Sequence, residues 1–175
     1  MLSEAHELED GSRVRLRLTK PSDAQLVHEF LERLSPQTRE RRFLQPMPSV
    51  TESSVRYFTF FDPRDRITFA ATMPAAGSER IVGLADAAFL GTGLAEIGVV
   101  VGDEHQGQGV GKLLSEAVAS LAIKRGATHL KAQMQSGNTP MLRLFERLGR
   151  TVRTLEEGTS TAYVRLRADR RFPAA

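Results

Sequence analysis

The chain has 175 residues, and its 24 lysines and arginines outnumber its 21 aspartates and glutamates, which gives a net charge of +3. The arginines are scattered, without a basic run of the kind that binds nucleic acid, so we expect a solvated surface and no nucleic-acid partner. The absence of cysteine excludes disulfides, thiolate metal sites and cysteine nucleophiles, and the four histidines show no metal-binding spacing.

The length of the chain suits one domain, which we expect to span residues 13–170. Residues 1–12 are rich in acidic side chains and poor in apolar ones, which predicts a flexible acidic N-terminal arm. This arm lacks the apolar segment of a secretory signal, and no later stretch is long enough to span a bilayer. We therefore expect a cytoplasmic protein with no membrane partner.

The first part of the chain predicts one strand followed by three helices. Polar and apolar residues alternate over residues 13–18, as in a half-buried strand, and apolar residues three and four apart follow Pro21, as in a helix. Ser35 and Pro36 are typical of a second helix start. A third helix is expected within residues 49–61, whose aromatic side chains either reach the core, the interpretation we favour, or line a substrate entrance.

The rest of the chain predicts six strands and two helices. Three apolar runs separated by turn residues predict an antiparallel meander. A helix then returns the chain to a strand parallel to the last strand of the meander, and a further helix leads into a closing hairpin. These strands are expected at residues 67–73, 81–90, 97–101, 130–135, 150–155 and 161–167. The order predicts an α/β (α+β) fold with a mixed, mostly antiparallel central sheet of about seven strands flanked by helices.

A glycine-rich loop joins the strand at residues 97–101 to the helix that follows it. Its missing Cβ atoms and its position at a helix N-terminus, where backbone N–H groups are unpaired, predict a cradle for phosphate. A dinucleotide fingerprint would need glycine at Lys112, and a nucleoside triphosphatase loop would need glycine at Gln106 and a hydroxyl at Leu113, so neither motif fits. Taken alone, the loop could equally be a tight turn of purely structural importance.

Two motifs resemble those of the GNAT family of N-acetyltransferases. The pattern Gln-x-x-Gly-x-Gly, at Gln106, Gly109 and Gly111, is similar to the family's acyl-CoA pyrophosphate loop. The stretch from Asn138 to Gly149 is similar to the family's later motif, an asparagine and a helix that ends in leucine-glycine before another strand. The resemblance implies the GNAT fold over nearly the whole chain, with the sheet splayed between its fourth and fifth strands and acetyl-CoA bound in that splay.

The resemblance also implies which residues contact the cofactor. Backbone groups of the fourth strand would bond the pantetheine arm and the loop amides would hold the pyrophosphate, while Asn138, which also fits a helix N-cap, would contact the arm from the other side. Gly98 in the fourth strand marks a bulge or a place where a ligand approaches the backbone. The implied cofactor contacts are Val99, Val100, Val101, Gln106, Gly107, Gln108, Gly109, Val110, Gly111, Lys112, Asn138, Met141 and Phe145.

Glu96, at the start of the fourth strand, is the candidate catalytic residue. An amine must lose a proton before it attacks a thioester, and a lysine with a pKa of about 10.4 is almost fully protonated at neutral pH. Many relatives supply a glutamate base from this position, so the resemblance implies that role for Glu96; the alternative is an exposed carboxylate at a strand end. Phe145 stands where many relatives carry a tyrosine that protonates the leaving thiolate, which leaves a non-catalytic acyl-CoA-binding regulatory module as the alternative to N-acetyltransfer.

The expected acceptor is an amine, either a protein lysine or a small molecule. Residues 34–43 are similar to a segment in the GNAT domains of bacterial protein lysine acetyltransferases that regulate acyl-CoA synthetases; the alternative is a basic, solvated helix face. Dimers are common in the family, so a homodimer is a candidate assembly, although no interface is legible in the sequence. The sequence decides neither the acceptor nor the preferred acyl chain.

Overall fold

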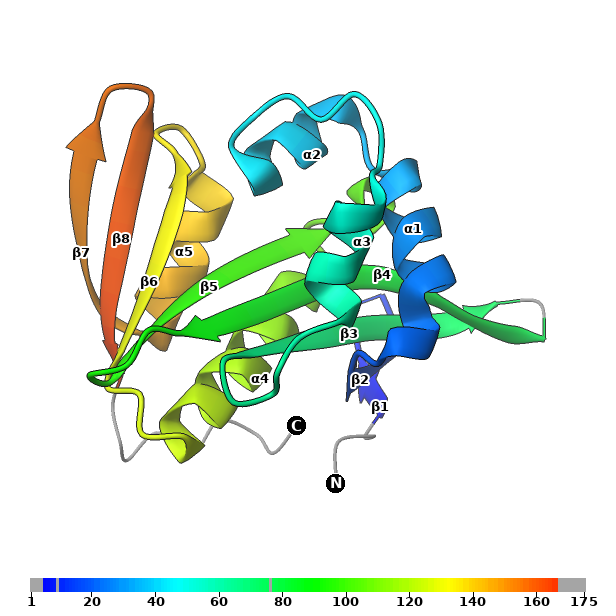
Figure 1. Cartoon of the computed structure of the whole chain (residues 1–175), viewed down its shortest axis with the longest axis horizontal. Coiled ribbons are helices and arrows are strands. Elements are labelled where there is room, and N and C mark those ends of the chain that lie inside the picture. The colour runs from blue at the N-terminus through cyan, green and yellow to red at the C-terminus, as the bar shows by residue number, and fades with distance from the viewer. Residues whose placement is uncertain (1–4, 9, 76, 167–175) are drawn as a thin grey trace.

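The structure, a computed structural model, describes residues 5–8, 10–75 and 77–166, and within these residues eight strands form one sheet (Figure 1). The sheet has the order β1-β2-β3-β4-β5-β6-β8-β7. Its strands are β1 (Ala5–Glu7), β2 (Arg13–Leu18), β3 (Arg66–Ala75), β4 (Ser78–Phe89), β5 (Leu94–Val101), β6 (His129–Gln135), β7 (Gly149–Glu156) and β8 (Thr159–Leu166).

Five α-helices and two short 3-10 helices occur in the part of the chain that the structure describes. They are η1 (Pro21–Asp23), α1 (Ala24–Arg33), α2 (Pro36–Phe43), α3 (Glu52–Thr59), η2 (Asp103–His105), α4 (Val110–Lys124) and α5 (Thr139–Leu148). The longest, α4, has 15 residues, and none of the described helices is long and apolar enough to cross a membrane.

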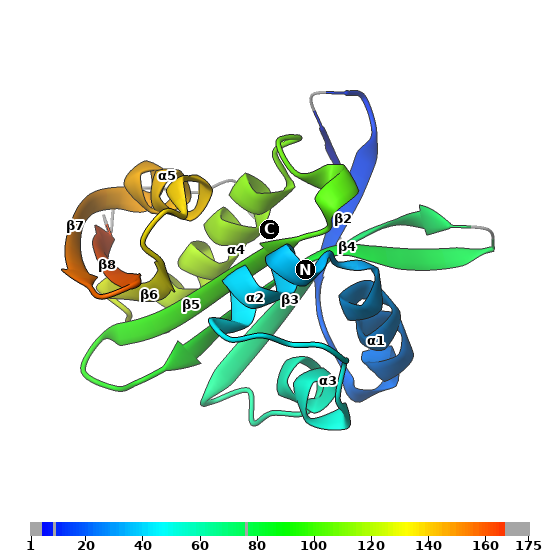
Figure 2. The same ribbon diagram turned by 90° about the horizontal axis from the view of Figure 1, so that it is seen from above.

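The sheet is mixed and mostly antiparallel, and helices cover both of its faces. Among the described strands, β5 and β6 are the one parallel pair, because α4 carries the chain back to the end of the sheet where β5 began. Figure 2 shows α4 and α5 on one face and α1, α2 and α3 on the other. The predicted fold class is confirmed, and all seven predicted strands are present.

Two apolar cores fill the two sides of the sheet, because successive strand residues point to opposite faces. Phe69 packs with Leu114 in the core beneath α4, whereas its neighbour Ala70 packs with Phe30 and Phe58 beneath α1 and α3. All five side chains are at most 1% exposed. The preferred expectation that the aromatic side chains of α3 reach the core is confirmed for Phe58.

Part of the expected N-terminal arm belongs to the sheet. Residues Ala5–Glu7 form β1, which pairs antiparallel with β2, and Leu8 is buried in the core. The expected arm therefore includes a short strand, because the open edge of β2 offers backbone groups that such a strand can pair with whatever its side chains are. Residues 1–4 and 9 of the expected arm, and residues 167–170 of the expected domain, lie outside the described residues.

The sheet opens between β5 and β6, as expected. The two strands pair through three residue pairs, the last of which is Glu96 with Lys131. Beyond this pair the strands separate, and Figure 1 shows the two arrows diverging while β5 stays paired with β4 and β6 stays paired with β8. The backbone of β5 after Glu96 thus has one side without a strand partner.

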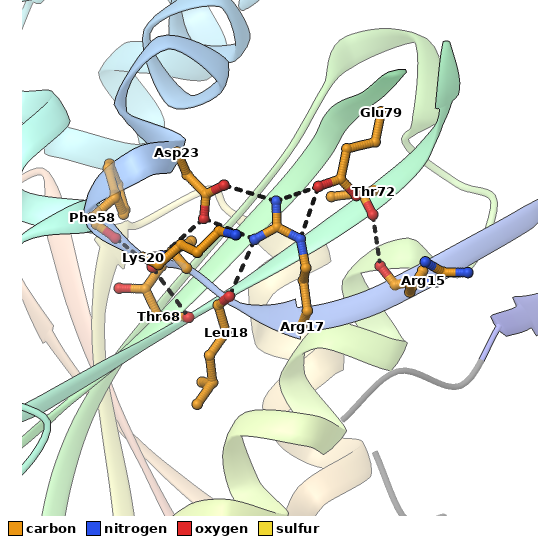
Figure 3. A network of polar contacts seen from close by, with 10 residues as sticks. Arg15, Arg17, Leu18, Lys20, Asp23, Phe58, Thr68, Thr72 and Glu79 are labelled. Carbon is orange, nitrogen blue, oxygen red and sulfur yellow. Dashed lines mark hydrogen bonds and ion pairs between the residues drawn. The ribbon is translucent and has the colours of Figure 1, made fainter. Parts of the chain in front are cut away.

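An arginine network fastens the start of α1 to the sheet (Figure 3). Arg17 on β2 donates to the two carboxylate oxygens of Asp23 at 2.8 and 2.9 Å, and it also forms an ion pair with Glu79 on β4. The backbone N–H of Lys20 donates to Asp23 at 2.8 Å. Burial alone would raise the pKa values of Asp23 and Glu79, but the hydrogen bonds from Arg17 lower both below their usual values.

Replacing Arg17 by methionine is expected to lower the free energy of unfolding at neutral pH by about 3 kcal/mol. The reason is that Asp23, whose side chain is 4% exposed, would keep its charge without its partner. Because the folded-state pKa values of Asp23 and Glu79 are lowered, their contribution is present above the unfolded-state values and is lost as the pH falls through the folded-state values. Urea unfolding should therefore show that the difference in the free energy of unfolding between wild type and variant becomes smaller on acidification. A difference that does not depend on pH would contradict the proposed role of Arg17.

Candidate active site

The glycine-rich loop leads into the N-terminus of α4 and leaves it open. Gly107 and Gly109 have φ angles of +77° and +93°, in the left-handed region that favours glycine, and a Cβ atom at either position would meet nothing within 4 Å. Gly109 is the N-cap residue of α4, and no described side chain caps this helix. The first N–H groups of α4 therefore face space that an anion could occupy.

A cavity of about 550 Å³ lies between this loop and α5. Residues 99–101 of β5 and the loop form one wall, and α5 forms the opposite wall. No aspartate or glutamate is found among the described lining residues, whereas five basic side chains line the cavity: Arg41, Arg42, Lys112, Arg143 and Arg147. This charge suits a ligand that carries several phosphates.

Most of the predicted cofactor contacts lie around this cavity, which is lined by Val99, Val100, Val101, Gln106, Gly107, Gly109, Gly111, Lys112, Asn138 and Met141. Three predicted residues, Gln108, Val110 and Phe145, do not line it. Val110 is fully buried, which leaves its backbone N–H as the group that a ligand at the helix N-terminus could contact. Phe145 is fully buried in the core, because the rotation of α5 turns it inward, and its contact with the cofactor stays a prediction.

A second cavity, of about 400 Å³, is lined by residues of α2, α3, β3, β4, β5, β6 and α5. It shares Arg41, Arg42, Val99, Asn138 and Met141 with the first cavity, so the two meet where β5 and β6 separate. Its further polar walls are Tyr57, Arg66, Asp86, Glu96 and Gln133. Two ligands could therefore reach one meeting point from different sides.

Glu96 lies in the second cavity, at the pair where the splay begins. Its Oε2 accepts a hydrogen bond from Nζ of Lys131 at 3.1 Å, and its side chain is 39% exposed. The carboxylate is therefore open to an acceptor in the cavity, and Lys131 is the cation with which that acceptor would compete.

Comparison with known families fits this geometry. The model of the Acetyltransferase (GNAT) family matches residues 27–149 of the chain. The chain belongs to the GNAT acetyltransferase family. The matched region contains Glu96, the glycine-rich loop and Asn138, so it spans both cavities.

Several GNAT relatives resemble most of the chain. Acetyltransferase PA5475 of Pseudomonas aeruginosa is 28% identical over 143 residues, which cover 81% of this chain and 77% of that protein. Acetyltransferase Pat of Mycolicibacterium smegmatis is 29% identical over 147 residues, covering 82% of this chain but 43% of the relative. The crystal structure of the GNAT domain of S. lividans PAT matches with a TM-score of 0.84 at 28% identity, covering 94% of this chain and 97% of that domain. The predicted GNAT fold is confirmed.

In this GNAT domain, Arg42 occupies the space above Gly98. A Cβ atom at Gly98 would lie 2.6 Å from Cζ of Arg42, and Arg42 forms an ion pair with Asp86, which also accepts a hydrogen bond from the Tyr57 hydroxyl at 2.8 Å. Burial alone would lower the pKa of Arg42, but Asp86 raises it, so the guanidinium stays charged. The register of β4 with β5 runs through Gly98 without a shift. No bulge therefore occurs at Gly98, which makes room for an arginine and also lines the second cavity, so the approach of a ligand to its backbone stays a prediction.

Replacing Gly98 by alanine is expected to displace Arg42 and to lower kcat/KM about tenfold, since Arg42 borders both cavities and small displacements at a reaction site are costly. Steady-state kinetics measure the loss, and thermal unfolding of the same variant separates it from a loss of folded protein. Unchanged kinetics would show that the position of Arg42 does not matter for turnover.

Asp103 fastens α2 beside the glycine-rich loop. It accepts hydrogen bonds from the backbone N–H of Ser35 at 2.9 Å and from the Thr38 hydroxyl at 2.6 Å. Burial alone would raise the pKa of Asp103, but these hydrogen bonds lower it, so the carboxylate stays charged at the N-terminus of α2. Nε2 of Gln106 in the loop donates to the Thr38 hydroxyl of α2 at 3.4 Å and to the Val101 carbonyl of β5 at 3.2 Å. Helix α2 is thereby held next to the loop.

Several basic side chains of helix α2 are buried or line the cavities. Arg39 is 9% exposed and Arg42 is enclosed, while Arg41 borders both cavities, so the alternative of a merely solvated face is wrong. Arg41 and Arg42 were not predicted as lining residues, because an eight-residue helix without an apolar stripe does not reveal its orientation. Arg143 and Arg147 were not predicted either, although two arginines four residues apart after Asn138 were a usable signal for a basic helix face.

Proposed function

We propose that this GNAT domain transfers the acetyl group of acetyl-CoA to an acceptor amine, with Glu96 as the general base. The observation that carries the proposal is the meeting of two cavities at the splay between β5 and β6. One cavity is basic and bordered by the glycine-rich loop, and the other contains Glu96. Direct transfer in a ternary complex needs such an arrangement, because both ligands must be present at one point.

The residues of the first cavity fit acetyl-CoA. The open N–H groups of α4 would hold the pyrophosphate, and Lys112 and Arg143 would offset the charge of further phosphate. The unpaired side of β5 would bond the amide groups of the pantetheine arm. Asn138 caps α5 by accepting from the Met141 N–H at 3.2 Å, which leaves its amide NH₂ for the same arm. Acetyl-CoA, when bound, supplies the activated acetyl group.

Glu96 would accept the proton that the amine must lose, directly or through a water molecule. An amine that displaces Lys131 from this carboxylate comes to lie at the start of the splay. Phe145 is buried and carries no hydroxyl, so it supplies no acid for the leaving group. A thiol with a pKa of about 8.5 leaves readily enough for water to protonate it.

The acceptor amine is proposed to belong either to a protein lysine or to a small molecule. The similarity of residues 34–43 to a segment of bacterial protein lysine acetyltransferases supports a protein lysine. The second cavity, with a volume of about 400 Å³, supports a small-molecule acceptor equally. The chemistry required of Glu96 is the same for both.

Thiol release from acetyl-CoA, measured against a panel of amino acids, polyamines, aminoglycosides and an acyl-CoA synthetase, tests the proposal. We expect release that depends on an acceptor and a product that is heavier by one acetyl group. Acetyl-CoA binding without release from any member of the panel would instead favour a regulatory module that binds acyl-CoA and does not turn it over.

A further inference from the structure

Arg66 and Glu96 lie in one row across the sheet. The strand registers pair Arg66 with Ala88, Ala88 with Glu96, and Glu96 with Lys131, so all four residues share one face of β3, β4, β5 and β6. Neighbouring strands are about 4.8 Å apart, which puts Arg66 and Glu96 roughly 10 Å apart along this row. Between them stands only the methyl group of Ala88, and all three residues line the second cavity.

The guanidinium of Arg66 has no anionic partner among the described residues. Its Cζ lies 3.9 Å from the centre of the Tyr57 ring, on which it stacks. Its Nε is buried without a hydrogen-bond partner, and no ion pair of Arg66 occurs within the described part of the chain. Stacking on an aromatic face leaves the edge of a guanidinium free, and this edge is the part that binds a carboxylate with two parallel hydrogen bonds.

The carboxylates of the same cavity are already engaged. Asp86 accepts from Arg42 and from Tyr57, and Glu96 accepts from Lys131. None of them neutralises Arg66, which therefore presents a localised positive charge to whatever enters the cavity. Arg66 is half-buried, and its Nε, which is shut off from solvent without a hydrogen-bond partner, is costly to keep so unless a ligand satisfies it.

We infer that the acceptor is an amine whose own molecule carries a carboxylate, with the carboxylate bound at Arg66 and the amine placed at Glu96. This inference rests on the proposed amine acetyltransfer and names its substrate class. A free amino acid has this chemistry, and so does a lysine beside an acidic residue in a peptide. Arg66 is thus a specificity-determining residue, and Ala88 leaves room for the part of the acceptor that joins its two charged ends.

The test compares acceptors that differ only in the carboxylate. Lysine is compared with lysinamide, and a peptide with aspartate beside its lysine is compared with one that has asparagine there. Because a charge-assisted hydrogen bond is worth a factor of about 10 to 100, wild type should favour the carboxylate member of at least one pair by that factor in kcat/KM. The pair that shows the preference identifies the source of the carboxylate.

Arg66→Gln should remove this preference by raising KM for the carboxylate acceptor, with kcat and the KM for acetyl-CoA unchanged. Arg66→Lys, which keeps the charge but loses the paired hydrogen bonds, should keep part of it. Arg64→Gln is the matched control, since Arg64 is exposed and pairs with Asp62. A preference that survives in Arg66→Gln, or equal losses on both members of a pair, would overturn the inference.

A binding measurement separates failure of this inference from failure of the proposed function. Both pairs, lysine with lysinamide and the aspartate peptide with the asparagine peptide, are titrated into the CoA-loaded protein, in wild type and in Arg66→Gln, without any turnover. Tighter binding of the carboxylate member of either pair that depends on Arg66 supports the carboxylate site even if no acceptor of the panel is acetylated. Equal binding within both pairs overturns it, even if the enzyme acetylates amines.

Discussion

Replacing Glu96 by glutamine is expected to lower kcat for acetyl transfer by about 100- to 1,000-fold and to leave the affinity for acetyl-CoA unchanged. The amide has nearly the shape of the carboxylate but cannot act as a base. Affinity for acetyl-CoA should not change, because Glu96 lines the second cavity and not the first cavity, beside the glycine-rich loop. The loss should shrink as the pH rises toward the pKa of the free amine, because the acceptor then arrives without its proton.

The variant Lys131→Gln is the matched control for this experiment. It removes the same ion pair but keeps the carboxylate, so it separates the loss of a base from the loss of a salt bridge. We expect Lys131→Gln to retain most of the wild-type rate. Equal rates for wild type and Glu96→Gln across the pH range would show that Glu96 is not the base, whereas equal losses in both variants would assign it a structural role.

Replacing Gly109 by glutamate is expected to weaken the binding of acetyl-CoA by at least about 100-fold. The backbone at this position has a φ of +93°, and the new side chain would enter the space in front of the open N-terminus of α4. Its carboxylate would occupy the place of the pyrophosphate and repel the remaining phosphate groups. Calorimetric titration measures the loss directly.

The control for this substitution is Gly109→Ala, which introduces the same backbone strain without a charge. A Cβ atom at this position meets no neighbour, so the alanine variant should fold with a stability cost of about 1–2 kcal/mol and retain part of the affinity. If Gly109→Glu bound acetyl-CoA as tightly as Gly109→Ala, the glycine-rich loop would not be the pyrophosphate site.

The parts of the fold that depend on local sequence patterns could be predicted. The apolar run of β5, the glycine-rich loop and the apolar spacing of α4 are continuous in the sequence, and so the order of strand, loop and helix was legible. The splay followed from the family resemblance and is visible as the end of pairing after Glu96. By contrast, β1 is three residues long and has no apolar pattern, so only the edge of β2 determines it.

Apart from Glu96, whose role the family resemblance implied, the acceptor side of the site could not be predicted, because strand register decides it. Arg66, Asp86 and Glu96 are separated by ten or more positions in the chain, and only the pairing of β3, β4 and β5 brings them to one cavity. A one-residue change of register would move each of them to the opposite face. The burial of Phe145 could not be predicted for a related reason, since the rotation of α5 about its axis is set by packing and not by the motif.

Hydrogen–deuterium exchange of the wild-type protein, with and without acetyl-CoA, locates the bound cofactor. We propose that the cofactor lies along the unpaired side of β5 and against the N-terminus of α4. We predict that acetyl-CoA slows exchange at the amides of residues 99–101 and 107–112. If acetyl-CoA produced no protection there, or protected only other parts of the sheet, the assignment of the cofactor site would be wrong.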